Sequence, residues 1–298
     1  MPLALPALPE ARLRALSHDY HAVRARARRR FLSGAAATLL LALASGWMAE
    51  VDFSLLARRG DQFFDYFGRM LRLESGAHAG EWVWRDPAEW LWGLGHWLRL
   101  LGDTVLMAYV GTLFGALGGF ALALLAAENL VTNAPLRWAA KRSLEFCRTV
   151  PDMVFALIFV IAFGLGPLPG VMALAIHSAG ALGKQALEII ENIDHHPVEG
   201  CMASGGTWLS VIRFGVVPQI LPGLLAYGLL RFEMNVRGAA VLGFVGAGGI
   251  GQELIEAIRK FYYNDVAALL VLIILTVSVI DILASQLRHR LLQAESSR

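Results

Sequence analysis

The chain has 298 residues, a length that by itself would suit about two soluble domains. Its composition argues against a soluble protein, because 56% of its residues are hydrophobic and 17% are charged, against roughly 45–50% and 25% in soluble chains. The formal net charge of +2 gives no general attraction for nucleic acid. Two cysteines, Cys147 and Cys201, exclude a disulfide framework and a CxxC metal site. We therefore expect an all-α integral membrane protein.

Six apolar segments are candidates for membrane-spanning helices, since a bilayer core of ~30 Å needs about 20 residues per helix. One uncharged run holds two of them, separated by the turn sequence GLGPLPG (164–170) with its two prolines and three glycines. The predicted spans are 31–49, 104–127, the two parts of 153–190 on either side of that turn, 214–244 and 266–287.

The lysines and arginines near the span ends predict the orientation. Five arginines precede the first span, and basic residues also lie between the second and third spans and after the last. If the chain has six spans and a cytoplasmic tail at each end (1–30 and 288–298), all three groups of basic residues lie in the cytoplasm. The external segment 50–101 agrees less well, because it carries six arginines among eight acidic residues. The basic groups are Arg24, Arg26, Arg28, Arg29 and Arg30, then Arg137, Lys141 and Arg142, then Arg288 and Arg290.

Two flanking segments allow two interpretations each. Segment 50–101 holds five of the eight tryptophans, at 82, 84, 90, 92 and 97. Tryptophan favours the membrane–water boundary, so this segment forms either interfacial helices or a small packed cap. Residues 10–23 form either an amphipathic helix or a solvated tail, and the sequence slightly favours the tail.

The polar segment 191–223 lies between the fourth and fifth spans. Pro197 is suited to begin a short helix with Glu199 in its first turn, and Gly205 and Gly206 are suited to end it. A second short helix is expected over 208–217, before Pro218. Such rigid helices in a long connection indicate a docking surface on the cytoplasmic side, although an inert connector is the alternative.

The same segment resembles the EAA loop of ABC importer permeases. The shared positions are Glu199, Gly205 six residues later, and Pro218 thirteen further. Two positions depart from the pattern: Gly200 stands where alanine is usual, and Gly215 stands where a hydrophobic residue is usual. The sequences 175–191, 231–251 and 279–291 resemble phosphonate-type permeases, so that the resemblance runs from about Asp103 to the C-terminus.

The resemblance implies a type I ABC importer permease with the methionine-importer-like fold, in which a five-helix core (102–287) carries a coupling loop (191–217). It implies a homodimer in the bacterial inner membrane, with two ATPase subunits below and a periplasmic substrate-binding protein above. The substrate would be phosphonate or a related oxyanion such as phosphite, hypophosphite or a phosphate ester. Glu199, Gly200, Gly205 and Pro218 would couple the chain to the ATPase.

The sequence contains no GxxxxGK[ST] phosphate loop, in agreement with a non-catalytic subunit whose ATPase partner binds ATP and Mg²⁺. We expect no cofactor or metal in this chain. The alternative is a secondary transporter or channel for a small anion without an ATPase partner. That alternative predicts inverted repeats, and the sequence shows no convincing repeat.

A charged group interrupts the fifth span, at Arg231, Glu233, Asn235 and Arg237. Ionisable groups inside a membrane are costly and mark functional sites by default. An arginine here would attract an oxyanion along the pathway, because its planar fork matches phosphate-like oxygens. Glu233 and Arg237 are four residues apart and can pair, so the alternative is an ion pair that only holds helices in register.

The glycine-rich sequence GFVGAGGIG (243–251) follows the fifth span. No βαβ unit surrounds it, which excludes a dinucleotide loop. Its glycines predict close helix packing or a turn near an outer gate, followed by an amphipathic helix over 252–263.

Overall fold

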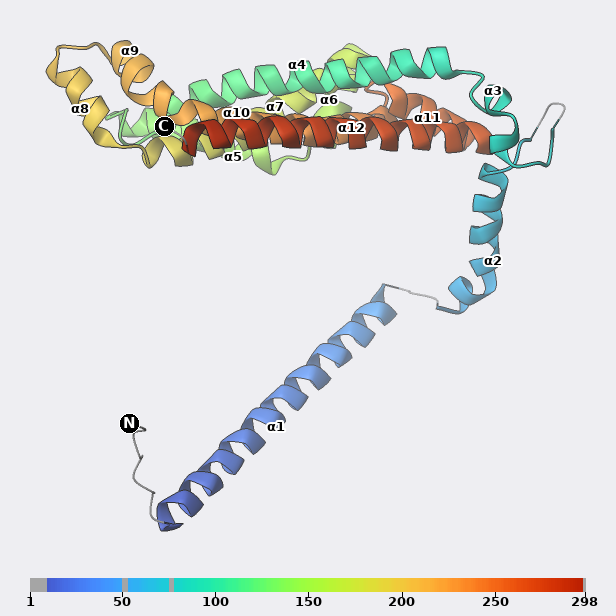
Figure 1. Cartoon of the computed structure of the whole chain (residues 1–298), viewed down its shortest axis with the longest axis horizontal. Helices are drawn as coiled ribbons and strands as arrows, with labels where there is room; N and C mark the ends of the chain where they lie inside the picture. Colours follow the sequence, from blue (N-terminus) through green and yellow to red (C-terminus); the bar gives the residue numbers. More distant parts are fainter. Residues whose placement is uncertain (1–9, 50–52, 75–77, 297–298) are drawn as a thin grey trace, which may run out of the picture. The chain divides into compact units, whose positions relative to one another are not determined.

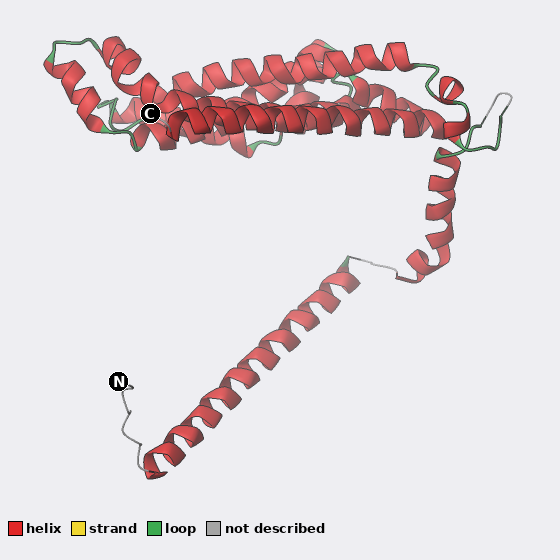
Figure 2. Ribbon diagram, in the orientation of Figure 1, coloured by secondary structure: helices red, strands yellow, loops and turns green. Residues whose placement is uncertain are grey.

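The computed structural model describes residues 10–49, 53–74 and 78–296 (Figures 1 and 2). Within these ranges the regular structure is helical apart from one isolated bridge between Arg72 and Trp82, so the predicted all-α class is confirmed. The chain divides into two compact units, 1–64 and 65–298, which are described separately.

The first unit contains α1 (Glu10–Met48) and most of α2 (Phe53–Met70). Helix α1 covers the first predicted span as far as Met48 and continues back to Glu10, so the segment 10–23 is helical. That this helix lies on a membrane surface stays a prediction. The hydroxyl of Ser33 donates to the carbonyl of Arg30, and that of Thr38 donates to the carbonyl of Gly34. These bonds satisfy both hydroxyls within the helix, as a membrane span requires.

The second unit is built on four long helices: α4 (Leu94–Ala126), α7 (Pro167–Glu191), α10 (Val217–Leu242) and α12 (Tyr263–Ser296) (Figure 1). Residues with higher numbers in α4 contact residues with higher numbers in α7, so these two helices are parallel. Residues with higher numbers in α10 contact residues with lower numbers in α7, so α10 runs antiparallel to both. We call the end of this bundle that carries α8 the α8 end, and the opposite end the α11 end.

Four helical stretches in the described residues are long and apolar enough to cross a membrane: 23–48, 94–126, 208–245 and 263–291. They correspond to the first, second, fifth and sixth predicted spans. The fourth predicted span is α7, which at 25 residues is long enough but carries Lys184, Glu188 and Glu191. It packs against α4, α5, α6 and α10, and this central position explains its lower apolarity.

The third predicted span has a different form from the one the sequence indicated. The segment treated as a loop with Arg137, Lys141 and Arg142 is a helix, α5 (Ala134–Thr149), and α6 (Asp152–Phe163) follows it at a bend of 88°. Together they form one broken span candidate. The bend falls at Val150, because the residue before a proline, here Pro151, is pushed out of the helical conformation.

Glycines hold α4 and α7 close together. A Cβ added at Gly115 would lie 2.5 Å from Cβ of Ser178, and one at Gly119 would lie 2.5 Å from the carbonyl oxygen of Ala179. Gly111 makes a similar approach to Leu174. Three glycines at a spacing of four therefore let the two backbones touch, as small residues do in membrane helix pairs.

At the α11 end, the two predicted glycine turns pack against each other. The N–H of Gly166 donates to the carbonyl of Gly246 at 3.0 Å, and Gly246, Gly248 and Gly249 all have positive φ. The N–H of Ile250, the first residue of α11 (Ile250–Arg259), donates to Oγ1 of Thr104 at 2.9 Å. The sequence 243–251 is thus a tight turn between helices, as expected.

The tryptophan-rich segment forms a packed cap at the same end, through η1 (Val83–Arg85) and α3 (Pro87–Trp90). Trp97 is fully buried, and the indole N–H groups of Trp90 and Trp92 donate to the Asn264 carbonyl and the Asp265 carboxylate. Trp97 is thus packed against the bundle, whereas Trp84 and Trp92 stay exposed, and the external cap stays a prediction. The interfacial position of α2, whose Phe63 and Phe64 are exposed, stays a prediction.

Candidate functional site

The candidate site is the connection between α7 and α10. It consists of α8 (His195–Ala203), α9 (Trp208–Ser210) and a π-helical turn, η2 (Val211–Val216), that leads into α10. Figure 1 shows α8 and α9 beyond the ends of α4 and α12, at the end of the bundle where the chain terminates. Two short helices project here, as the sequence predicted.

Helix α8 begins two residues earlier than predicted. Its N-cap is Asp194, whose carboxylate accepts the N–H of His196 at 3.0 Å. Aspartate is a strong N-cap, and it takes this role ahead of the proline signal at Pro197. The expected place of Glu199 in the first turn is wrong, because Glu199 is the fifth residue of the helix.

Helix α8 ends where the sequence predicted. Gly205 has a φ of +77°, in the left-handed region that favours glycine, and its N–H donates to the carbonyl of Met202. The next N–H, of Gly206, donates to the carbonyl of Cys201 at 3.0 Å. These bonds fix the direction in which the chain leaves α8.

The inner face of α8 explains one departure from the EAA pattern. Val198 is buried, and a Cβ added at Gly215 would lie 3.2 Å from its Cα. Glycine at 215 therefore makes room for α8 to seat on η2. The opposite face is open: Glu199 is exposed, and no atom lies within 4 Å of a Cβ added at Gly200. Pro218, also exposed, is the second residue of α10.

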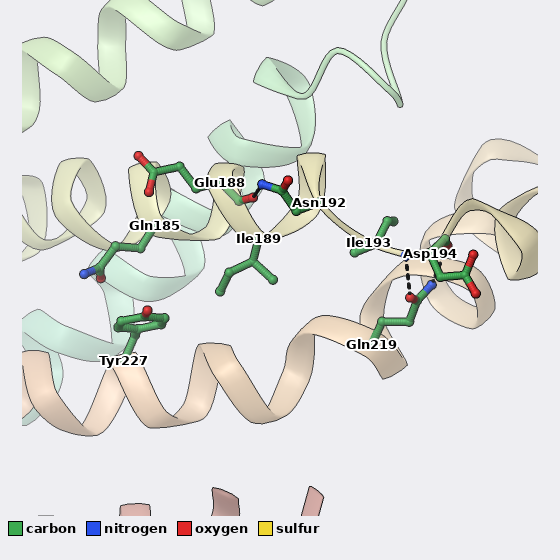
Figure 3. A pocket seen from close by; sticks show the side chains of 8 residues that line it. All are labelled: Gln185, Glu188, Ile189, Asn192, Ile193, Asp194, Gln219 and Tyr227. Carbon is green, nitrogen blue, oxygen red and sulfur yellow. Dashed lines mark hydrogen bonds between the residues drawn. The ribbon is translucent and has the colours of Figure 1, made fainter. Parts of the chain in front are cut away.

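A polar groove of about 460 Å³ lies at the base of α8, between α7 and α10 (Figure 3). Gln219 links the two sides, since it accepts the N–H of Asp194 at 3.0 Å and donates to the Asp194 carbonyl at 3.1 Å. The residue that caps α8 is thereby tied to the first turn of α10. The groove is lined by Gln185, Glu188, Ile189, Asn192, Ile193, Asp194, Gln219 and Tyr227.

The Asp194 carboxylate also contacts the ring of His196, with 2.6 Å between Oδ1 and Nδ1. This hydrogen bond raises the pKa of His196 and lowers the pKa of Asp194. Because the pKa of His196 is raised, the contact stabilises the start of α8 fully at pH values below the ordinary pKa of histidine. That stabilisation is lost as pH rises through the raised pKa of His196. Both groups are exposed to solvent, so salt screens the pair.

A charged cluster that sequence reasoning missed joins α5 and α7 to the turn after α4, at the α8 end. The Lys141 ammonium lies 2.9 Å from the Glu128 carboxylate and 3.3 Å from the Glu191 carboxylate. The hydrogen bond from Lys141 lowers the pKa of Glu128. Asn129 adds a hydrogen bond to the carbonyl of Ile190 at 2.7 Å. The end of α7, from which the chain leads into α8, is thus tied to α5 and to the turn after α4.

The four polar residues predicted in the fifth span divide between two faces of α10. Arg231 and Asn235 are buried against α4 and α7. Nε of Arg231 donates to Oγ of Ser178 at 3.0 Å, and Nδ2 of Asn235 donates to Oγ of Ser178 and Oγ1 of Thr112, both at 2.8 Å. These two side chains therefore link the three helices to one another.

Glu233 and Arg237 form the predicted ion pair on another face of α10. The Glu233 carboxylate is buried, whereas the Arg237 side chain is 54% exposed. Arg237 belongs to an exposed stripe that includes Tyr227, Met234 and Val241. A charged group at such a position is costly in lipid, so we expect this stripe to face another protein surface or water.

His177 on α7 has Nδ1 at 3.1 Å from the carbonyl of Val150. It thereby contacts the backbone at the bend between α5 and α6.

Comparison with solved structures identifies the fold. The chain is similar to the MetNI methionine ABC transporter in an inward-facing conformation, with a TM-score of 0.57 and 22% identity over 69% of this chain and 98% of that chain. The predicted type I ABC importer permease fold is thus confirmed.

Comparison of sequences identifies the family. The chain is 39% identical over 196 residues to the phosphite transport system permease protein PtxC of Stutzerimonas stutzeri, covering 66% of this chain and 71% of that protein. It is also 39% identical over 195 residues to the phosphate-import permease protein PhnE of Mycolicibacterium smegmatis, covering 65% of this chain and 37% of that protein. Residues 119–294 match the family of binding-protein-dependent transport system inner membrane components. The chain belongs to this family, and it is a multi-pass permease of the inner membrane.

Proposed function

We propose that the chain is the non-catalytic permease subunit of an ATP-driven importer for a small phosphorus oxyanion. The observation that carries the proposal is α8, a short helix that presents Glu199 and Gly200 on its open face and seats Val198 on η2. Such a helix is suited to lie in a groove on an ATPase and to transmit its movement. Nucleotide-driven closure would shift α7 and α10 together, because Gln219 and the Lys141 cluster tie the base of α8 to the bundle.

The orientation follows from the same helix. If α8 meets the ATPase, the α8 end and the C-terminus lie in the cytoplasm, and the glycine turns and tryptophan cap of the α11 end lie outside. The basic residues of α5 and of the segment before residue 31 then fall on the cytoplasmic side, as the positive-inside rule expects. ATP and Mg²⁺ would bind to the ATPase partner, and a periplasmic binding protein would deliver substrate at the α11 end.

The substrate class is supported by two observations. The relatives carry the names of a phosphite and a phosphate transporter, and Arg237 offers a half-exposed guanidinium on a stripe that cannot face lipid. A second copy of the chain on the other side of this stripe would enclose an aqueous pathway. Arginine suits phosphorus oxyanions because its planar donors match two oxygens at once.

The assembly predicted by this proposal is two copies of the chain, two ATPase subunits and one binding protein. We expect the co-expressed subunits to purify together. Native mass spectrometry of the detergent-solubilised complex should then show equal numbers of this chain and of the ATPase. A complex with one copy of this chain for two ATPases would contradict the proposed dimer.

The role of Arg237 is tested by a double-mutant cycle with Glu233. If Arg237 serves the pathway, Arg237→Gln should slow uptake, and Arg237→Gln with Glu233→Gln should restore protein yield but not transport. The yield is expected to recover because a lone buried carboxylate is more costly than a removed pair, by about 3–5 kcal/mol. Yield and substrate uptake in proteoliposomes are measured separately for the two single variants and the double variant.

Recovery of both yield and transport in the double variant would instead assign the pair a structural role. Wild-type uptake by Arg237→Gln alone would remove Arg237 from the pathway.

A further inference from the structure

Five arginines surround α1 immediately before its apolar stretch. Arg24, Arg26, Arg28, Arg29 and Arg30 fall within seven residues, and no acidic residue lies between Asp19 and Glu50. We call these five residues the arginine collar. They are all exposed and all belong to one continuous helix. At about 100° per residue they leave no gap wider than about 120° around the helix axis, so the collar presents positive charge in every direction.

The length of the apolar stretch places the collar relative to a membrane. Residues 31–48 contain no charge and span about 27 Å at about 1.5 Å per residue, close to the ~30 Å thickness of a hydrocarbon core. Trp47 stands at the far end with an exposed fraction of 84%, where an indole ring marks the opposite interface. When this stretch crosses the bilayer, the collar therefore falls in the headgroup layer.

We propose that the arginine collar binds the phosphate groups of anionic phospholipids and holds a ring of them around α1. The charge is complementary, and basic clusters next to a membrane span attract anionic lipids. All five residues are arginine, whose planar guanidinium can give two parallel hydrogen bonds to one phosphate. The distribution around the whole helix fits several lipids better than one protein partner, which would meet a single face. The proposal is independent of the transported substrate.

The test measures lipid retention by the full-length protein. The chain is reconstituted in vesicles of phosphatidylcholine and phosphatidylglycerol at a known ratio and extracted in mild detergent, and the two lipids are quantified by mass spectrometry. We expect phosphatidylglycerol to be enriched at least about fivefold over the vesicles, since even one arginine near an anionic surface contributes a factor of about five. Replacing all five arginines by glutamine should return the ratio to that of the vesicles, whereas replacement by lysine should keep part of the enrichment.

Two controls separate lipid binding from other effects. Arg58→Gln with Arg59→Gln removes two exposed arginines outside the collar and should retain lipid like the wild type. Because the full glutamine variant can fail to insert, a variant with Arg24, Arg26 and Arg28 changed to glutamine keeps two arginines for insertion and should lose most of the enrichment.

Three results would overturn the proposal. The first is a wild-type lipid ratio equal to that of the vesicles, and the second is an enrichment unchanged in the three-arginine variant. The third is loss of the enrichment in inorganic phosphate but not in sodium chloride of the same ionic strength, which would assign the collar to free phosphate.

Discussion

Replacement of Gly119 by alanine is expected to destabilise the bundle strongly, although only one methyl group is added. The new Cβ would lie 2.5 Å from the carbonyl oxygen of Ala179 and 2.9 Å from the amide nitrogen of Gly183. Both atoms belong to the backbone of α7 and cannot rotate away, so α4 and α7 must separate. Overpacking of this kind costs about 1–3 kcal/mol, which corresponds to a fall in melting temperature of roughly 3–10 °C.

The matched control for this prediction is the neighbouring Gly118. A Cβ added there has its nearest atom, Cβ of Ala179, at 3.9 Å, which is an ordinary contact. Gly118→Ala should therefore melt within about 2 °C of the wild type, because a methyl group that meets only ordinary contacts at this half-buried position changes stability by about 0.5 kcal/mol. The measurement is thermal unfolding of both purified variants in the same detergent. Equal melting temperatures for the two variants would show that the α4–α7 contact is not as close as described.

Replacement of Gly205 by valine is expected to uncouple ATP hydrolysis from transport. The space around Gly205 is open, with no atom within 4 Å of an added Cβ, so the effect comes from the backbone alone. A φ of +77° is unfavourable for a β-branched residue by about 1–2 kcal/mol, a factor of roughly 5–30 in the population of the native turn. We expect substrate-stimulated ATPase activity and uptake in liposomes to fall together by this factor, while insertion and dimerisation survive.

Two substitutions serve as controls, one at Gly205 itself and one within α8. Gly205→Asn should retain most of the coupling, since asparagine tolerates the left-handed conformation better than other residues. Gly200→Ala adds a methyl group in open space at a helical position and should be neutral or slightly stabilising.

Glu199→Lys, which reverses the charge on the open face of α8, should uncouple ATP hydrolysis from transport as Gly205→Val does. Normal stimulation and uptake in both Gly205→Val and Glu199→Lys would contradict the coupling role.

The sequence predicts the parts of the fold that depend on local chemistry. Apolar run length locates α1, α4, α10 and α12, and two adjacent glycines locate the turn at 205–206. The turn predicted over 164–170 is shorter in the structure, because α7 begins at Pro167. The bend between α5 and α6 was missed, although Pro151 marks it, because the basic residues of α5 resemble those of a cytoplasmic loop. The N-cap at Asp194 was missed for a similar reason, since Pro197 gives a competing start signal three residues later.

The parts that could not be predicted depend on which faces meet in space. Arg231, Glu233, Asn235 and Arg237 are a single group in the sequence, but helical periodicity sends two of them to α4 and α7 and pairs the other two. The spacing of Gly111, Gly115 and Gly119 is visible in the sequence and indicates close packing of some helix. Only the structure shows that the partner of this glycine face is α7.

The measurement that tests the central claim most directly is uptake of radiolabelled phosphite or an alkylphosphonate into proteoliposomes that contain this chain, its ATPase and its binding protein. We expect uptake to require ATP and the ATPase, and we expect Gly205→Val to lower it by the same factor of roughly 5–30 while the chain stays in the membrane. Uptake by this chain alone, driven only by an ion or substrate gradient, would contradict the account and would identify a secondary transporter or channel.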